Sequence, residues 1–197
     1  MVVELGLFSL IIALLLSGAQ AWFGLAGPAL GNRRWMAAAR PAVTGQWVFV
    51  AMSFGVLAWA FYRNDFSVLY VANNSNSELP TFYRFAAVWG AHEGSLLLWA
   101  LALSTWSVAV GAFSKDLPET YAARLLGVLG VVSVGFQLFI LLTSSPFERL
   151  IPAAVDGRDL NPLLQDPALA IHPPMLYIGY VGFSVAFAFA VAALLEG

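Results

Sequence analysis

The chain has 197 residues, of which 60% are hydrophobic and only 10% are charged, and its mean hydropathy is +0.81. Soluble domains are nearer half apolar and a quarter charged, so the composition argues against a water-soluble globule and for a membrane protein. The 9 basic and 11 acidic side chains give a net charge of −2, too small and too mixed for a nucleic-acid-binding surface. The absence of cysteine excludes a disulfide scaffold, a thiol nucleophile and an iron–sulfur cluster in this chain.

Five stretches are long and apolar enough to cross a bilayer, whose core of about 30 Å needs roughly 20 apolar residues in a helix. They cover about residues 5–27, 42–62, 86–113, 122–143 and 172–195, and the gaps between them leave no room for a soluble domain. The sequence therefore predicts an all-α fold, a single polytopic bundle of membrane-spanning helices. Because Glu4 precedes the first stretch and no Lys or Arg does, we expect an uncleaved first span rather than a secretory signal.

The distribution of basic residues predicts the orientation. The two short gaps, residues 28–41 and 114–121, together with the start of the next span, hold Arg33, Arg34, Arg40, Lys115 and Arg124. The long gaps, residues 63–85 and 144–171, hold fewer basic residues, and acidic residues dilute them. We therefore expect the C-terminus in the cytoplasm, and the N-terminus and both long loops outside, which in a bacterium is the periplasm. The second long loop mixes charges with leucine and proline, which predicts an ordered strap along the membrane surface.

Ionisable residues inside spans are costly and are the first functional candidates. His92 and Glu93 form the one clear pair, expected a few turns below the outer surface. On a helix, Gly90 and Gly94 beside them leave a notch where another helix can approach closely. The pair could carry protons, bind a cofactor or clamp an outer loop. A hydrogen-bonded pair that only fixes helix packing explains it as well.

His172 precedes two prolines at the start of the fifth span. A residue before proline is pushed out of helical geometry, whereas proline suits the first helical turn, so we expect His172 just outside the helix at the outer membrane boundary. A neutral histidine there is a candidate axial haem ligand, or a residue that only forms hydrogen bonds at a helix start. Tyr177 and Tyr180 continue a polar stripe that we expect to pack against neighbouring helices.

Four blocks of sequence resemble the amino-terminal third of the CcmF family of cytochrome c biogenesis proteins. They are WGAHEGSLLLW at 89–99, TSSPFER at 143–149, GRDLNPLLQDP at 157–167 and HPPMLYIGYVG at 172–182. The resemblance runs from the first span to the last residue, and the related NrfE proteins share the same blocks.

The resemblance implies a bacterial inner-membrane protein, or an organellar one in a split mitochondrial-type system, that forms part of the system I haem lyase. In that family haem b, delivered by the chaperone CcmE, is held at the periplasmic face and joined to apocytochrome c, which CcmH and CcmI present. His172 matches a family histidine that ligates the haem iron, and Trp89, His92, Glu93 and Tyr177 are weaker candidates at this site. The apocytochrome supplies both thiols, which agrees with the absence of cysteine here.

The family's tryptophan-rich platform and its other haem-binding histidines have no match in residues 1–197. The resemblance therefore implies either a protein split between two polypeptides or a truncated piece, which is not catalytic alone. From the residues themselves, the alternative is a structural scaffold, or a proton- or quinone-linked transport subunit in which His92 and Glu93 carry the path.

Overall fold

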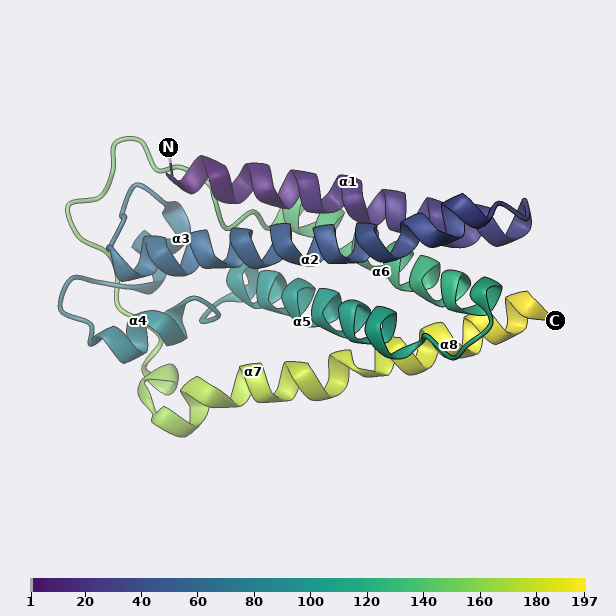
Figure 1. Cartoon of the computed structure of the whole chain (residues 1–197). Helices are drawn as coiled ribbons and strands as arrows, with labels where there is room; N and C mark the ends of the chain where they lie inside the picture. Colours follow the sequence, from purple (N-terminus) through teal and green to yellow (C-terminus); the bar gives the residue numbers. More distant parts are fainter. Residues whose placement is uncertain (1) are drawn as a thin grey trace.

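The computed structural model describes residues 2–197, and within them every regular element is a helix (Figure 1). The elements in chain order are α1 (Val2–Ala29), α2 (Arg33–Tyr62), α3 (Leu69–Asn74), α4 (Thr81–Ala87), α5 (His92–Phe113), α6 (Glu119–Thr143), the 3₁₀ turn η1 (Pro162–Gln165), α7 (Pro167–Val181) and α8 (Phe183–Glu196). Five segments are long and apolar enough to cross a membrane: α1, α2, α5, α6 and the continuous pair α7–α8. The prediction of an all-α bundle with five spans is confirmed.

The second span begins at Arg33 rather than near residue 42. Asn32 caps this helix, because its side-chain oxygen accepts hydrogen bonds from the backbone N–H groups of Arg34 (3.1 Å) and Trp35 (3.3 Å). Arg40, which had suggested a loop, lies inside the helix and donates to the carbonyl oxygens of Gly111 and Ser114 at the end of α5. The apolar stem of such a side chain stays in the bundle while its charged head reaches polar groups at the end.

The fifth span begins at Pro167, so His172 lies inside α7 and not outside the helix as expected. Asp166 caps the helix through its Oδ1 atom, which accepts hydrogen bonds from the N–H groups of Ala168 (2.9 Å) and Leu169 (3.1 Å). Pro167 takes the first helical position, where proline is favoured. This upstream cap and proline outweigh the local bias against a helical residue before Pro173.

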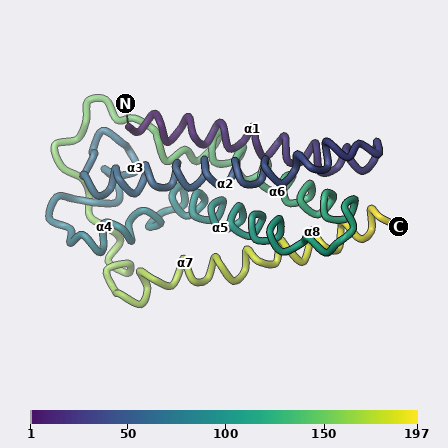
Figure 2. The backbone as a smooth tube through the Cα atoms, viewed as in Figure 1, coloured from purple at the N-terminus to yellow at the C-terminus, as the bar shows by residue number. Residues whose placement is uncertain are grey.

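The helices run roughly alongside one another, with the N-terminus at one end of the bundle and the C-terminus at the other (Figures 1 and 2). Helix α1 packs mainly against α2 and α6. A Cβ atom on Gly24 of α1 would lie 2.5 Å from the backbone of Gly127 of α6, so two glycines allow this close crossing. The Gln20 side chain donates across the same interface to the Leu126 carbonyl at 2.7 Å. Helices α7 and α8 run along the edge of the bundle, on α5 and α6.

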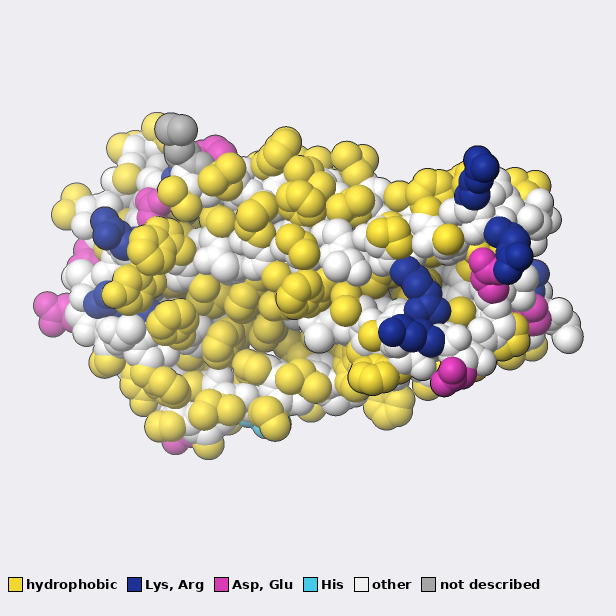
Figure 3. Space-filling view, viewed as in Figure 1, with side chains coloured by type: hydrophobic (Ala, Val, Ile, Leu, Met, Phe, Trp, Pro, Cys, Tyr) yellow, Lys and Arg dark blue, Asp and Glu magenta, His cyan; other side chains and the backbone are white. Residues whose placement is uncertain are grey.

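Both long loops lie at the N-terminal end and pack on each other; we call residues 63–91 and 144–166 the outer cap. A short antiparallel bridge pairs Val68 with Arg149, and the N–H of Arg158 donates to the carbonyl of Ala72 at 2.7 Å. Leu160 is only 1% exposed. The second loop is therefore ordered, as predicted, and contacts with the first loop hold it in place. Figure 3 shows charged side chains gathered toward the two ends of the molecule, with an apolar belt between them.

Candidate functional site

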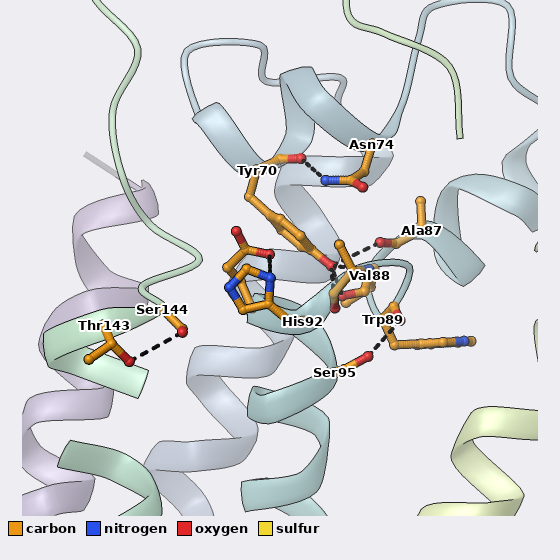
Figure 4. A network of polar contacts seen from close by, with 11 residues as sticks. Tyr70, Asn74, Ala87, Val88, Trp89, His92, Ser95, Thr143 and Ser144 are labelled. Atoms are coloured by element: carbon orange, nitrogen blue, oxygen red, sulfur yellow. Dashed lines mark hydrogen bonds and ion pairs between the residues drawn. The ribbon is translucent and has the colours of Figure 1, made fainter. Parts of the chain in front are cut away.

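The third span begins at His92 rather than at residue 86, because α4 and a turn of residues 88–91 precede α5. The hydroxyl of Tyr70 sits inside this turn, where it accepts a hydrogen bond from the N–H of Ala91 at 3.1 Å and lies 3.1 Å from the carbonyl oxygen of Val88 (Figure 4). Burial raises the pKa of Tyr70, so the hydroxyl keeps its proton and remains a donor to that carbonyl. Tyr70 therefore orders the start of α5.

Gly94 is packed against this turn. A Cβ atom at Gly94 would lie 1.7 Å from the Val88 carbonyl oxygen and 2.6 Å from the Tyr70 hydroxyl oxygen. The expected notch beside His92 thus exists, but the chain's own turn and Tyr70 fill it instead of another spanning helix.

His92 is the first residue of α5, at the outer-cap end of the span and not several turns below it. Its Nδ1 atom lies 3.3 Å from Oε2 of Glu93, so the expected pair forms. The His92 side chain is 68% exposed, whereas that of Glu93 is 27% exposed. The pair therefore belongs to the rim between the cap and the spans, because it lies at the helix end.

Trp89 points away from the histidine pair. In Figure 4 the Trp89 indole and the His92 imidazole extend to opposite sides of the turn. The indole Nε1 of Trp89 donates a hydrogen bond to the Ala170 carbonyl in α7 at 2.9 Å. This contact joins the block 89–99 to a residue just before the block 172–182, although the two are 81 positions apart in the sequence.

His172 lies on the free face of α7. The helix packs through Ala170 and Val181, which are buried. His172 is two residues after Ala170, and at about 100° per residue its side chain leaves the helix some 200° around from the packed face. The side chain is accordingly exposed. His172 and His92 therefore belong to different faces of the molecule and do not form one site.

Tyr177 lies two helical turns after Ala170, on the packed face. With Pro174, Ile178 and residues of α5 that include Trp106, it lines an apolar groove of about 400 Å³ between the two helices. Its ring also makes an edge contact with Tyr180, with 5.5 Å between the ring centroids. Tyr177 thus supports α7 against α5 and does not adjoin His172. Within residues 2–197 no group of three or more His, Asp or Glu side chains is arranged to hold a metal ion.

Two contributions were missing from the sequence interpretation. Tyr70 belongs to the short helix α3, which carries no motif, so nothing near it in the sequence predicted the partners of its hydroxyl. The Ala170 carbonyl could have been found, because prolines three and four residues later leave it without a helical donor.

Comparison with known proteins identifies the family of this chain. A family model described as cytochrome C assembly protein matches residues 89–196, more than half of the chain. CcmF of Pseudomonas aeruginosa is 61% identical over 198 residues, and that match covers 100% of this chain and 30% of the relative. CcmF of Escherichia coli is 58% identical over 187 residues, covering 94% and 28%. NrfE of Haemophilus influenzae is 45% identical over 199 residues, covering 99% and 31%.

A solved structure named cytochrome c heme lyase CcmF superposes with a TM-score of 0.86 at 30% identity, covering 100% of this chain and 31% of that one. The five spans define a multi-pass membrane protein. The chain belongs to the cytochrome c assembly protein family, and its resemblance to CcmF is confirmed. It spans about 30% of the length of the curated relatives it matches.

Proposed function

We propose that this chain is a haem-holding module of the system I cytochrome c haem lyase, and that His172 is one axial ligand of substrate haem b at the periplasmic face. The observation that carries the proposal is the position of His172. The side chain is exposed, near the outer-cap end of a fixed helix, on the face that the bundle does not use.

The surroundings of His172 suit a porphyrin. Met175 and Leu176 lie about one turn further along the same face and are 66% and 48% exposed. Nothing lies within 4 Å of the Cβ position of Gly179, two turns along this face. An exposed imidazole beside an open apolar surface matches what haem needs, because its iron takes a nitrogen ligand and its ring is apolar.

The protein's contribution would be to bind the haem and to orient it. Holding the haem against a rigid helix replaces a random encounter with a fixed geometry, which accounts for a large share of rate enhancement in bound reactants. Bound haem would supply the vinyl groups that react with the thiols of apocytochrome c. His172 leaves the second axial position to another part of the protein, since the chain's other histidine, His92, faces elsewhere.

The partners follow from the same proposal. They are the remaining part of the protein on the same or a second chain, the haem chaperone CcmE, CcmH, CcmI and apocytochrome c. The outer cap would face the periplasm from the bacterial inner membrane, because the opposite end of the bundle carries the denser basic residues, at the start of α2 and α6 and in the loop between α5 and α6.

The alternative, a proton- or quinone-linked subunit, has weaker structural support. A path through the membrane needs titratable groups along it. His92 and Glu93 lie at one end of α5, and the buried Gln20, Gln46 and Gln137 of the described spans carry no charge. The pair therefore would need further titratable groups to carry protons across.

The test uses the complete protein in its assembled membrane complex, with His172→Ala compared with His92→Ala and Glu93→Gln. We expect His172→Ala to assemble but to lose bound substrate haem and covalent cytochrome c formation, and added imidazole to restore haem binding. Haem content of the purified complex and haem-stained cytochrome c are the readouts. Retention of both by His172→Ala refutes the proposal, and loss confined to the His92 and Glu93 variants favours the proton-path alternative.

A further inference from the structure

One backbone carbonyl in α7 has no donor of its own helix. The carbonyl of residue i in a helix accepts from the N–H of residue i+4, or of residue i+3 in a tighter turn. For Ala170 these positions are Pro173 and Pro174, and proline has no N–H. An unpaired carbonyl is expensive where it is buried, so a neighbouring element has to supply the missing donor.

Trp89 supplies it. Its indole N–H donates to the Ala170 oxygen at 2.9 Å, and Ala170 is 1% exposed, so water does not compete for this acceptor. The donor is itself well fixed. The Trp89 carbonyl accepts from the hydroxyl of Ser95 at 2.8 Å, and its N–H donates to the carbonyl of Ala86 at 3.3 Å. The turn before α5 therefore presents a rigid indole to α7.

The position of this bond matters for His172. Ala170 is two residues earlier, about 3 Å along the axis and on the opposite side of the helix. A directional bond at Ala170 fixes both the rotation and the height of α7 at that level while leaving the opposite face free.

A second indole acts similarly lower in the helix. Trp106 of α5 donates to the Ile178 carbonyl at 3.0 Å, where the Gly182 N–H that would bond Ile178 in a continued helix turns to Tyr180 instead. This bond lies about 12 Å further along α7 from Ala170. The bond to Ile178 also holds α7 against α5, but at a greater distance from His172. The loss of this bond is therefore a matched control for the loss of the bond from Trp89.

We propose that Trp89 is a positioning residue for His172, and that the pair of prolines creates the acceptor through which it acts. This inference rests on the proposed role of His172 as a haem ligand. Trp89 does not contact the haem in this proposal; it sets where the imidazole stands.

The experiment compares Trp89→Phe with Trp106→Phe in the complete protein within its complex. Each substitution keeps an aromatic ring and removes one indole N–H. We expect Trp89→Phe to lower haem affinity about tenfold and to change the low-spin electron paramagnetic resonance signal of the bound haem. Trp106→Phe should lower thermal stability to a similar degree but keep the haem signal. Equal effects of both variants on the signal, or no effect of Trp89→Phe, overturn the inference.

Pro174→Ala separates positioning from mere support. The alanine restores an N–H at i+4 for Ala170, so the double variant Trp89→Phe/Pro174→Ala should regain the stability lost in Trp89→Phe. The double variant still lacks the hydrogen bond between residue 89 and the Ala170 carbonyl, so the altered haem signal should persist. Recovery of both stability and signal in the double variant shows that Trp89 only satisfies a carbonyl, and overturns the inference.

A measurement without haem completes the test. Spin labels on Ile171→Cys and Glu78→Cys report the distance from α7 to the outer cap, and we expect it to broaden in Trp89→Phe and to stay narrow in Trp106→Phe. The two proposals fail differently. Full haem binding by His172→Ala defeats the proposed function, whereas loss of haem by His172→Ala with an unchanged distance and signal in Trp89→Phe defeats only this inference.

Discussion

The guanidinium of Arg149 donates from Nε to Oε1 of Glu4 at 2.9 Å, across 145 positions of sequence. The same guanidinium donates to the Ser67 hydroxyl and lies 3.7 Å from the carboxylate of Asp65. One side chain of the second outer loop thus contacts both the first turn of α1 and the first outer loop. The outer cap is anchored on the bundle because these three segments meet at Arg149.

Arg149→Gln is expected to loosen the outer cap. Exposed ion pairs are weak individually, so we expect a rise of at most about fivefold in the opened state of the loop. Limited proteolysis of residues 150–161 in liposomes measures this opening. Arg149→Lys should recover only part of the protection, because an ammonium cannot reproduce the forked contacts of a guanidinium. Arg158→Gln, in the same loop but with an exposed side chain, is the control; equal sensitivity in that variant would count against the anchor.

Gly94→Ala is expected to destabilise the protein by about 3 kcal/mol, the upper range for overpacking. The added methyl would lie 1.7 Å from the carbonyl oxygen of Val88, a backbone atom that cannot move away without breaking the turn. Thermal unfolding in detergent, followed by intrinsic tryptophan fluorescence, is the measurement.

Gly135→Ala is the matched control for this substitution, because nothing lies within 4 Å of that Cβ position in α6. It should be neutral or slightly stabilising, since alanine is favoured over glycine in a helix by about 0.5–1 kcal/mol. If the two variants unfold at the same temperature, the close packing at Gly94 is not a constraint.

Acid is expected to release the two outer loops from each other at Asp156. The Ser77 hydroxyl, at 2.6 Å, and then the backbone N–H groups of Gly157 and Ser77 stabilise the carboxylate and lower the pKa of Asp156 below its ordinary value of 3.8. A lowered pKa in the folded state means that the contact stabilises the cap fully above about pH 4 and is lost as the pH falls further.

The mobility of a spin label on Glu78→Cys, followed from about pH 6 down to pH 2, measures this release. In Asp156→Asn the side chain does not titrate, so this component of the pH dependence should disappear. A curve that is unchanged in Asp156→Asn would assign the acid response to other groups.

The orientation can be tested with single cysteines, because the 197 residues contain none. A membrane-impermeant maleimide added to intact spheroplasts should label Glu78→Cys in the outer cap. Lys115→Cys, in the short exposed loop at the other end, should react only after lysis. The opposite labelling pattern would place the outer cap, and with it His172, in the cytoplasm.

The number and nature of the spans follow from the sequence because crossing a bilayer sets the length and polarity of a helix locally. Their ends do not. Residues 86–91 are as apolar as a span, yet they form the end of α4 and a turn, because the hydroxyl of Tyr70 and the absence of a side chain at Gly94 favour a turn there. The charge of Arg40 suggested a loop, yet the residue is helical, because its guanidinium donates hydrogen bonds to carbonyl oxygens at the end of α5.

The same distinction holds for the candidate site. The sequence by itself determined a membrane protein without cysteine in these 197 residues, the pairing of His92 with Glu93, and the place of His172 before two prolines at the start of the fifth span. Only the tertiary structure decided that His172 is inside α7 on its free face and that the Trp89 indole donates a hydrogen bond to the Ala170 carbonyl. The polarity of a span and the effect of proline on a helix depend on residues that are close in the sequence. A hydrogen-bond donor that the helix lacks can come from any segment that packs against it, and here the donor, Trp89, lies 81 positions from Ala170.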